Sequence, residues 1–294
     1  MIRLLGCYLL TGLLSVAQAQ VTVPEKSVPQ ETEVATVDQP AEPETGRLNF
    51  KVDPDGYSII STVRGLSTHK STFFYPLSYS PDFHGENTEM VFQISAKQRL
   101  FGTNLYLAYT QKSFWQFINE DESSPFRETN YDPEIFYRWI PDAERFNHWG
   151  ADVGFEHESN GREYPSSRSW NRVYFAPFQA KGKHLAYLKL WYRIPEGDPS
   201  TDLDKTGDDN PDINDFYGYS ELSFSRQIGG DQLLSGMLRG NARTGKGAVS
   251  FTWSIPSSDG YAFYGATVFH GYGESLIDYN QKQTRLMIGI LLAR

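Results

Sequence analysis

Residues 149–159 read WGADVGFEHES, and in most of this stretch apolar residues alternate with glycine or acidic residues. The odd positions from 149 to 155 carry Trp, Ala, Val and Phe, whereas the even positions carry glycine or an acidic residue. Because successive side chains of a β-strand point to opposite faces, this pattern predicts a strand with one apolar and one polar face. His157 and Ser159 have the parity of the apolar residues, so we expect both on the apolar face.

His157 and Ser159 together form a minimal set for nucleophilic catalysis, since an imidazole can accept the proton of a neighbouring hydroxyl. Asn171 belongs to the following predicted strand and shares the parity of Val173 and Phe175, so it faces the same side. A neutral amide can accept the imidazole N–H and fix its tautomer. A lone His-x-Ser pair is most often accidental. Three polar groups on one apolar stripe favour a working network, because each is costly there unless it is paired.

The same alternation recurs from residue 89 to the end of the chain, and glycine-rich turns such as Gly229-Gly230 separate the alternating stretches. Clear examples are Phe92–Ala96, Leu188–Ile194, Leu222–Ser225, Val249–Ile255 and Leu286–Leu292. No helical period of comparable strength is present. About a dozen strands of ~10 residues fit the span, which is the length of membrane strands. The predicted fold class is therefore all-β, a transmembrane antiparallel β-barrel of about 12 strands.

The alternation alone leaves open which face of the sheet is the outside. A soluble β-sandwich or a lipocalin-like barrel has the same alternation with its apolar face inward. Aromatic residues make up 15% of the chain, and many fall near predicted strand ends, which favours an outer-membrane barrel with aromatic girdles. The residues expected in these girdles are Trp115, Trp149, Tyr174, Trp191 and Tyr264. Residues 72–76 predict only a short edge or terminal strand, because Pro76 cannot donate to a ladder.

The first residues are typical of a secretory signal peptide. Arg3 precedes an apolar run from Leu4 to Val16, and Ala17-Gln18-Ala19 forms an A-x-A cleavage pattern, so residues 1–19 are predicted to be removed near Ala19. Residues 20–47 are predicted to be a disordered, acidic, Pro-rich linker, to which we assign no function. Residues 48–294 then form the barrel domain.

Composition excludes several function classes. The chain has 1 cysteine, Cys7, and it lies in the signal segment, so the mature protein has neither a disulfide framework nor a thiolate metal site. The net charge of −9 argues against nucleic acid as a partner.

One group of motifs goes beyond the alternation. The sequence from His157 to Arg162, HESNGR, is followed by SRSWNR at residues 167–172, and together they resemble the active-site motif of the outer membrane phospholipase A family. Further similar segments follow in the family's order. They are YTQKS at 109–113, ESSPFRETNY at 122–131, DDNPDI at 208–213 and GYGESLIDYN at 271–280. The resemblance runs from about residue 89 to the end of the chain.

The resemblance implies a twelve-stranded barrel with its active site on the lipid-facing outer wall. Ser159 would attack acyl esters, His157 would act as general base and then acid, Asn171 would orient His157, and the main-chain N–H of Gly161 would bind the oxyanion. The implied activity is hydrolysis of glycerophospholipids and lysophospholipids, at sn-1 and sn-2, with release of fatty acids. The implied location is the outer membrane of a Gram-negative bacterium.

The resemblance also implies a calcium ion and a homodimer that is active only when calcium is bound. The implied ligands are the main chain of Arg162 and the hydroxyl of Ser167 on one subunit, and Ser123 on the other. Calcium prefers oxygen ligands, which agrees with this set. Gln111 matches a polar residue of the family's dimer interface.

Two departures from the family pattern stand out. Tyr164 occupies a position where some relatives have an aspartate, and this departure argues against a second calcium site that is independent of the dimer. Asp209 is the candidate ligand for such a site. The chain ends in Ala293-Arg294 instead of the terminal aromatic residue common in outer-membrane barrels.

Two rival functions remain from the sequence. One is a non-enzymatic barrel, either a narrow pore or a scaffold, and the other is a soluble secreted esterase. A pore has no reason to place His157, Ser159 and Asn171 together on the lipid side. A soluble esterase requires the apolar face of the strands to point inward.

Overall fold

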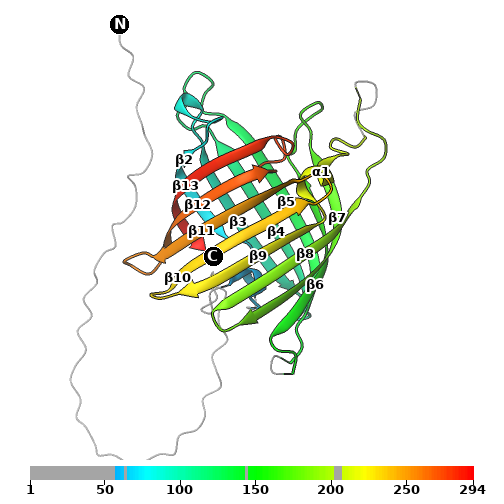
Figure 1. Cartoon of the computed structure of the whole chain (residues 1–294), viewed down its shortest axis with the longest axis vertical. Coiled ribbons are helices and arrows are strands. Elements are labelled where there is room, and N and C mark those ends of the chain that lie inside the picture. Colours follow the sequence, from blue (N-terminus) through cyan, green and yellow to red (C-terminus); the bar gives the residue numbers. More distant parts are fainter. Residues whose placement is uncertain (1–56, 63–64, 143–144, 202–206) are drawn as a thin grey trace, which may run out of the picture. The chain divides into compact units, whose positions relative to one another are not determined.

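Antiparallel strands wrap into a barrel in the computed structural model, which describes residues 57–62, 65–142, 145–201 and 207–294 (Figure 1). The predicted signal peptide and linker, residues 1–47, lie outside the described residues. No helix in the described ranges is long and apolar enough to cross a membrane.

Strands make up most of the described chain; one short helix precedes the first strand, and two more lie between later strands. The strands are β1 Leu66–Thr68, β2 Thr72–Tyr79, β3 Met90–Leu100, β4 Leu105–Trp115, β5 Phe126–Trp139, β6 Trp149–Ser159, β7 Ser169–Lys181, β8 His184–Ile194, β9 Ser220–Ile228, β10 Gln232–Asn241, β11 Lys246–Pro256, β12 Phe263–Tyr272 and β13 Lys282–Ala293. The helices are η1 Ser58–Ile60, η2 Gly85–Asn87 and α1 Ile213–Tyr217.

The sheet closes on itself. It has 13 strands, and β3 pairs with β4 at one edge and with β2 at the other, while β13 pairs with β2. Twelve consecutive strands, β2 to β13, therefore form a closed antiparallel ring, as the alternation and the resemblance predicted. The short β1 pairs with the same edge of β3 as β2 does, but at other residues of β3, with Leu66 opposite Gln98.

The apolar residues of the strands point outward. Leu77 and Tyr192 are each 66% exposed and Val153 is 57% exposed, although all three lie within strands. Their neighbours of opposite parity, such as Asp152 and Arg193, are buried inside the barrel. An apolar outer wall around a polar interior is the arrangement of a membrane barrel, so the soluble sandwich and lipocalin alternatives are wrong.

The strand-end aromatic residues divide between the two faces. Trp149 and Tyr264 are 47% and 51% exposed near the ends of β6 and β12, as expected for a girdle. Tyr174 and Trp191 are instead buried, so their assignment to the girdle was wrong. They have the parity of inward-facing charged residues, and the alternation therefore turns them into the barrel.

The expectation for residues 72–76 was also wrong. β2 continues to Tyr79 as a full member of the ring, with Pro76 inside it. The ladder adapts at the proline, because pairing of β2 with β3 ends at Tyr75 and the register with β13 shifts between Ile288 and Ile290. A bulge is one of the places where a strand tolerates proline.

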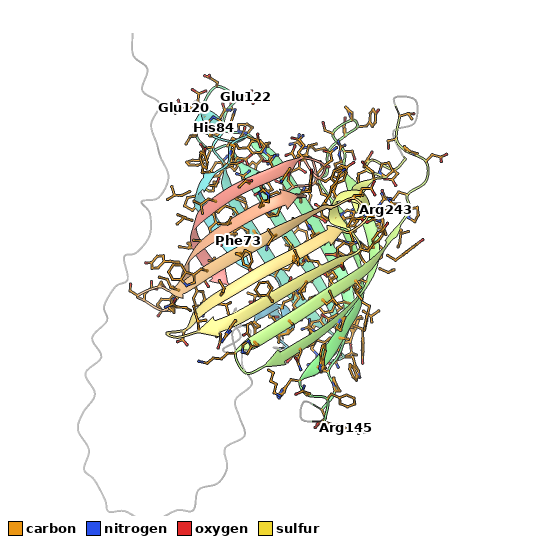
Figure 2. All side chains as sticks on the ribbon, viewed as in Figure 1. Phe73, His84, Glu120, Glu122, Arg145 and Arg243 are labelled. Atoms are coloured by element: carbon orange, nitrogen blue, oxygen red, sulfur yellow. The ribbon has the colours of Figure 1, made fainter. Side chains whose placement is uncertain are left out.

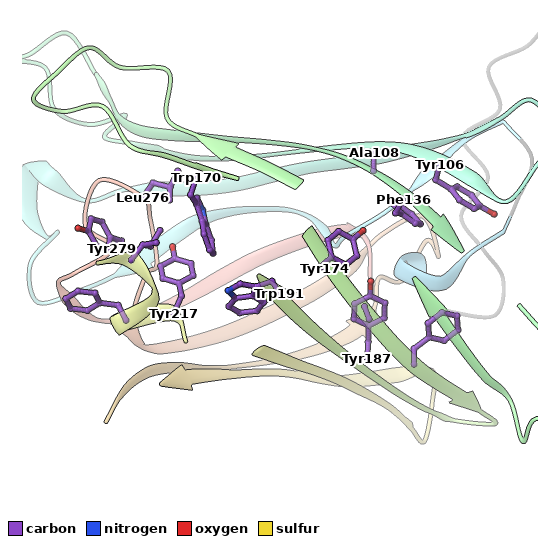
Figure 3. Close-up of a cluster of buried hydrophobic side chains, with 14 residues drawn as sticks. Tyr106, Ala108, Phe136, Trp170, Tyr174, Tyr187, Trp191, Tyr217, Leu276 and Tyr279 are labelled. Carbon is purple, nitrogen blue, oxygen red and sulfur yellow. The ribbon is translucent and has the colours of Figure 1, made fainter. Parts of the chain in front are cut away.

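Side chains fill much of the barrel interior. One cluster of buried aromatic and aliphatic residues includes Tyr106, Phe136, Trp170, Tyr187 and Trp191 (Figure 3). Buried ion pairs accompany it, among them Arg138 to Asp152 at 2.7 Å. A cavity of about 390 Å³, lined by residues of most strands, remains in the interior.

Consecutive antiparallel hairpins place alternate loops at the same end of the barrel. The loops 116–125, 160–168, 195–219 and 273–281 therefore share one end, which we call the site end. Figure 2 shows Glu120 and Glu122 of loop 116–125 at this end and Arg145, between β5 and β6, at the opposite one. The candidate residues Ser123, Arg162, Ser167 and Asp209 all lie in loops of the site end.

The outward orientation of the apolar face can be tested at Val268, in the middle of β12 and 47% exposed. We expect Val268→Arg to lower the free energy of unfolding of the vesicle-inserted protein by about 2–4 kcal/mol relative to wild type, because the charge would lie at mid-membrane depth. Val268→Leu is the control and should change little. Urea titration followed by tryptophan fluorescence measures both. Equal stability of the two variants would mean that this face contacts water.

Candidate active site

The register of β6 with β7 brings the predicted site residues together. His157 faces Asn171 directly, and Ser159 faces Ser169 in the next position of the ladder. On the other side of β6, Ser159 faces Tyr131 of β5. The three residues proposed from the sequence therefore occupy one small area of the wall at the site end.

The imidazole of His157 is held by the amide of Asn171. Nδ1 of His157 lies 2.9 Å from Oδ1 of Asn171. An amide oxygen only accepts hydrogen bonds, so Nδ1 carries the hydrogen and Nε2 of the neutral ring has a free lone pair. No hydrogen bond joins Ser159 to the ring in the described chain; such contacts are often loose until substrate binds.

The trio lies on the outer wall. His157, Ser159 and Asn171 are partly exposed. The neighbours of the same parity, Phe155 and Val173, are apolar and are 39% and 44% exposed. The trio is therefore next to the lipid-facing surface and not in the polar barrel interior.

Asn171 has a second partner that the sequence did not reveal. Its Nδ2 donates a hydrogen bond to Oε1 of Glu196, which follows the end of β8. The other oxygen of Glu196 accepts a hydrogen bond from the Ser169 hydroxyl at 3.1 Å. In the sequence Glu196 was visible only as part of the turn Pro195-Glu196-Gly197, because nothing there indicates which residue of β8 pairs with Asn171.

Asn160 organises the loop 160–168. Its Nδ2 donates to the carbonyl of Ser166 at 2.9 Å, and its Oδ1 accepts from the main-chain N–H groups of Arg168 at 2.9 Å and Arg162 at 3.3 Å. The main chain of Asn160 also donates to the carbonyl of Arg168 at 3.0 Å. Sequence reasoning gave this residue no role, although an Asn directly after a strand is a common loop-closing residue.

Gly161 follows Asn160 with φ of +65°, a conformation that favours glycine. A Cβ atom at this position would lie 3.2 Å from the ring of Tyr131. Glycine therefore lets the chain turn sharply beside Ser159 while the aromatic ring packs against it.

Oxygen-bearing groups gather beside this loop. The Ser167 hydroxyl donates to Oδ2 of Asp209, and the Ser200 hydroxyl donates to Oδ1 of Asp209 at 2.9 Å. Hydroxyl, carboxylate and main-chain carbonyl oxygens are the donors that Ca²⁺ prefers, so Ser167 and Arg162 fit the expected ion in chemistry. The Arg162 guanidinium is paired with a carboxylate, because its Nε lies 3.2 Å from Glu128 Oε2. This ion pair reduces the repulsion between Arg162 and a bound cation.

A separate acidic cluster in the barrel interior is less suited to a cation. Asp132, Glu134 and Glu156 have carboxylate oxygens within 4.8 Å of one another. Lys70 lies 2.6 Å from Asp132, and Lys189 lies 3.1 Å from Glu156. Protein cations thus already neutralise these carboxylates.

The remaining candidate, Gln111, projects from β4 with the parity of the exposed Leu107 and Tyr109. Its Oε1 accepts a hydrogen bond from the Tyr109 hydroxyl at 3.1 Å, and its Nε2 donates to Ser113 at 3.2 Å. It is a polar group beside Leu107 and Tyr109 on the outer face of β4.

A family model described as Phospholipase A1 matches residues 43–292. The chain belongs to this family. The family's curated proteins hydrolyse phospholipid esters, so the chain is an enzyme of that class, and its barrel is an outer-membrane barrel.

Individual relatives agree with this assignment. The chain is 39% identical to Phospholipase A1 of Escherichia coli (strain K12) over 224 residues, which cover 73% of either protein. It is 35% identical over 259 residues to a putative phospholipase A1 of Neisseria meningitidis serogroup B, covering 77% of this chain and 65% of the relative.

Solved structures are similar as well. The outer membrane phospholipase A of Escherichia coli superposes with a TM-score of 0.66 at 36% identity, covering 77% of this chain and 91% of that one. The outer membrane phospholipase of Salmonella typhi, a dimer with bound calcium, has a TM-score of 0.66 at 34% identity, covering 79% of this chain and 93% of the other.

The role of Asn160 as the organiser of its loop gives a direct test. Asn160→Ala removes three side-chain hydrogen bonds to the main chain. We expect tryptic cleavage after Arg162 and Arg168 to accelerate by about 10- to 100-fold, because each lost bond favours the open loop. The control is Asn280→Ala, which removes an exposed amide from loop 273–281. Unchanged cleavage in Asn160→Ala would show that other contacts hold the loop.

Proposed function

We propose that the chain is a calcium-dependent phospholipase A that cleaves acyl esters of glycerophospholipids and lysophospholipids, at sn-1 and sn-2, through Ser159, His157 and Asn171. The observation that carries the proposal is the 2.9 Å contact from His157 to Asn171 on the lipid-facing wall, two residues from Ser159. Such a position lets a lipid ester reach the serine without leaving the membrane.

The first half of the reaction forms an acyl-enzyme. Oγ of Ser159 attacks the ester carbonyl carbon while its proton passes to Nε2 of His157, the nitrogen that Asn171 leaves free. The carbonyl oxygen becomes an oxyanion. When the tetrahedral intermediate collapses, the bond to the glycerol oxygen breaks and that oxygen takes the proton from His157.

The second half returns the enzyme to its starting state. His157 accepts a proton from water as the water oxygen attacks the acyl carbon. The bond to Ser159 then breaks, its oxygen regains a proton from His157, and a fatty acid leaves. Throughout, Oδ1 of Asn171 keeps the hydrogen on Nδ1, so one ring nitrogen performs every proton transfer.

The oxyanion requires fixed positive potential. We assign this role to the main-chain N–H of Gly161, which follows Ser159 by two residues in the turn at φ +65°. A calcium ion held by the main-chain carbonyl of Arg162, by Ser167 and by Ser123 of the partner subunit would add positive charge beside this position. Asp209, bonded to Ser167, is proposed as a contributor to a second calcium site.

We extend the proposal to assembly and location. The active form is a homodimer, and the outward-facing Gln111 lies in its interface. Ser123, exposed at the site end, is accessible to a second subunit there. The signal peptide directs export and is cleaved near Ala19, and the barrel resides in the outer membrane of a Gram-negative bacterium.

The nucleophile is tested with detergent-refolded protein and a phospholipid substrate. Ser159→Ala should lower kcat by about 10³-fold or more, and the double variant Ser159→Ala/His157→Ala should be no slower, because the two residues act as one unit. Released fatty acid is the measured quantity, and unchanged gel mobility of the folded barrel is the control. Full activity in Ser159→Ala would place the nucleophile elsewhere. No activity in folded, calcium-loaded wild type would favour the scaffold function.

The calcium site is tested by titrating activity against free calcium. Ser167→Ala should raise the calcium concentration for half-maximal activity by about 10-fold or more, because a coordinating hydroxyl is lost. Ser166→Ala, one residue earlier, is the matched control and should behave as wild type. Sedimentation of both variants reports whether dimer formation shifts over the same range. Identical titrations of the two variants would remove Ser167 from the ligand set.

A further inference from the structure

Glu196 binds the NH₂ group of the Asn171 amide, whereas the oxygen of the same amide contacts His157. Oε1 of Glu196 accepts the Asn171 amide hydrogen bond, and Oε2 accepts from Ser169 at 3.1 Å. Ser169 and Asn171 are two apart on β7, so both project to the outer side of the wall. The carboxylate therefore bridges two outward side chains of one strand.

The strand register explains why this acid reaches the site. Asn171 faces Ile194, the last residue of β8. In an antiparallel pair, moving two residues forward from Ile194 corresponds to moving two residues back from Asn171, so position 196 comes opposite position 169. Glu196 thus lies beside Ser169 and diagonal to Asn171, just past the strand end.

A carboxylate fixes the orientation of an amide in a way that a neutral partner does not. Ionised Glu196 only accepts hydrogen bonds, so the group of Asn171 that faces it must be the NH₂. The oxygen of Asn171 must then face His157, and it accepts only if Nδ1 carries the hydrogen. The flipped amide would place its oxygen against the carboxylate and its NH₂ against Nδ1–H, and both contacts would be repulsive.

The carboxylate of Glu196 forms no ion pair in the described ranges. The neighbouring acids inside the wall do form ion pairs: Glu156 and Glu158 both bind Arg172, at 3.0 and 3.2 Å. Its two oxygens are occupied by the amide and hydroxyl described above. A partly buried carboxylate with two neutral donors and no cation is suited to orienting those donors.

We propose that Glu196 is a positioning residue that fixes the Asn171 amide and thereby the reactive tautomer of His157. This inference rests on the proposed function of the trio. Glu196 is then a fourth member of the group formed by Ser159, His157 and Asn171. The neutral amide of Asn171 lies between its carboxylate and the imidazole, so the negative charge lies past the end of β8 and not within the lipid-facing strands.

The test compares Glu196→Ala and Glu196→Gln with wild type under saturating calcium. Glu196→Ala should lower kcat by about 10- to 100-fold and leave KM within about two-fold, because orientation and not substrate binding is lost. Glu196→Gln keeps an acceptor oxygen but can also turn its NH₂ toward Asn171, so it should recover only part of that loss. Asp198→Ala removes an exposed acid two residues along the same loop and should match wild type.

A double-mutant cycle with Asn171→Ala separates positioning from a general structural effect. If Glu196 acts through Asn171, Asn171→Ala/Glu196→Ala should be no slower than Asn171→Ala, within about two-fold. Losses that multiply would overturn the inference, since Glu196 would then act without Asn171. Equal losses in Glu196→Gln and Glu196→Ala would overturn it as well.

The outcomes also separate this inference from the proposed function. Wild-type activity that depends on Ser159, together with full activity in Glu196→Ala, overturns only the role of Glu196. Wild-type activity that survives in Ser159→Ala overturns the trio, and the role of Glu196 with it. Gel mobility of the folded barrel confirms that each variant compared is native.

Discussion

The carboxylate of Glu156 connects the wall that carries the site to the barrel interior. It is 1% exposed and binds Lys70, Arg172 and Lys189 at 3.2, 3.0 and 3.1 Å. Removing any one of these cations would leave the buried carboxylates of Glu156, Asp132 and Glu134 with less compensating charge, which is destabilising. These pairs hold β6, β7 and β8 in register from inside. Because side chains alternate, the same constraint turns His157 outward and sets it opposite Asn171.

A site on the outer wall limits which groups can serve there. A charged side chain facing hydrocarbon is expensive, and a neutral amide beside His157 avoids that cost. The one carboxylate of the constellation, Glu196, lies past the end of β8, at the site end. The loop closed by Asn160 brings Gly161, Arg162 and Ser167 to the same end. The chemistry thus lies where lipid, headgroup and water can meet.

Much of this was readable from the sequence, because a period of two fixes the face of every strand residue once one residue is placed. The outward trio, the closed ring and the family followed from the alternation and the motifs. The partners Glu196 and Asn160 did not, since they depend on strand register and loop closure over distances that no local pattern encodes. Pro76 was misjudged for a related reason: a bulge between β2 and β13 accommodates it. The roles of the site residues stay predictions.

The central claim is that Ser159 is a nucleophile reached from the lipid phase. The most direct measurement is covalent labelling of the protein in vesicles by two phosphonofluoridates, one with a long alkyl chain and one short and water-soluble, with mass spectrometry to locate the phosphonate. The account predicts modification of Ser159, lost in His157→Ala, and faster by about 10-fold or more with the long-chain reagent, whose chain partitions into the membrane. Labelling of another serine, or preference for the water-soluble reagent, would contradict it.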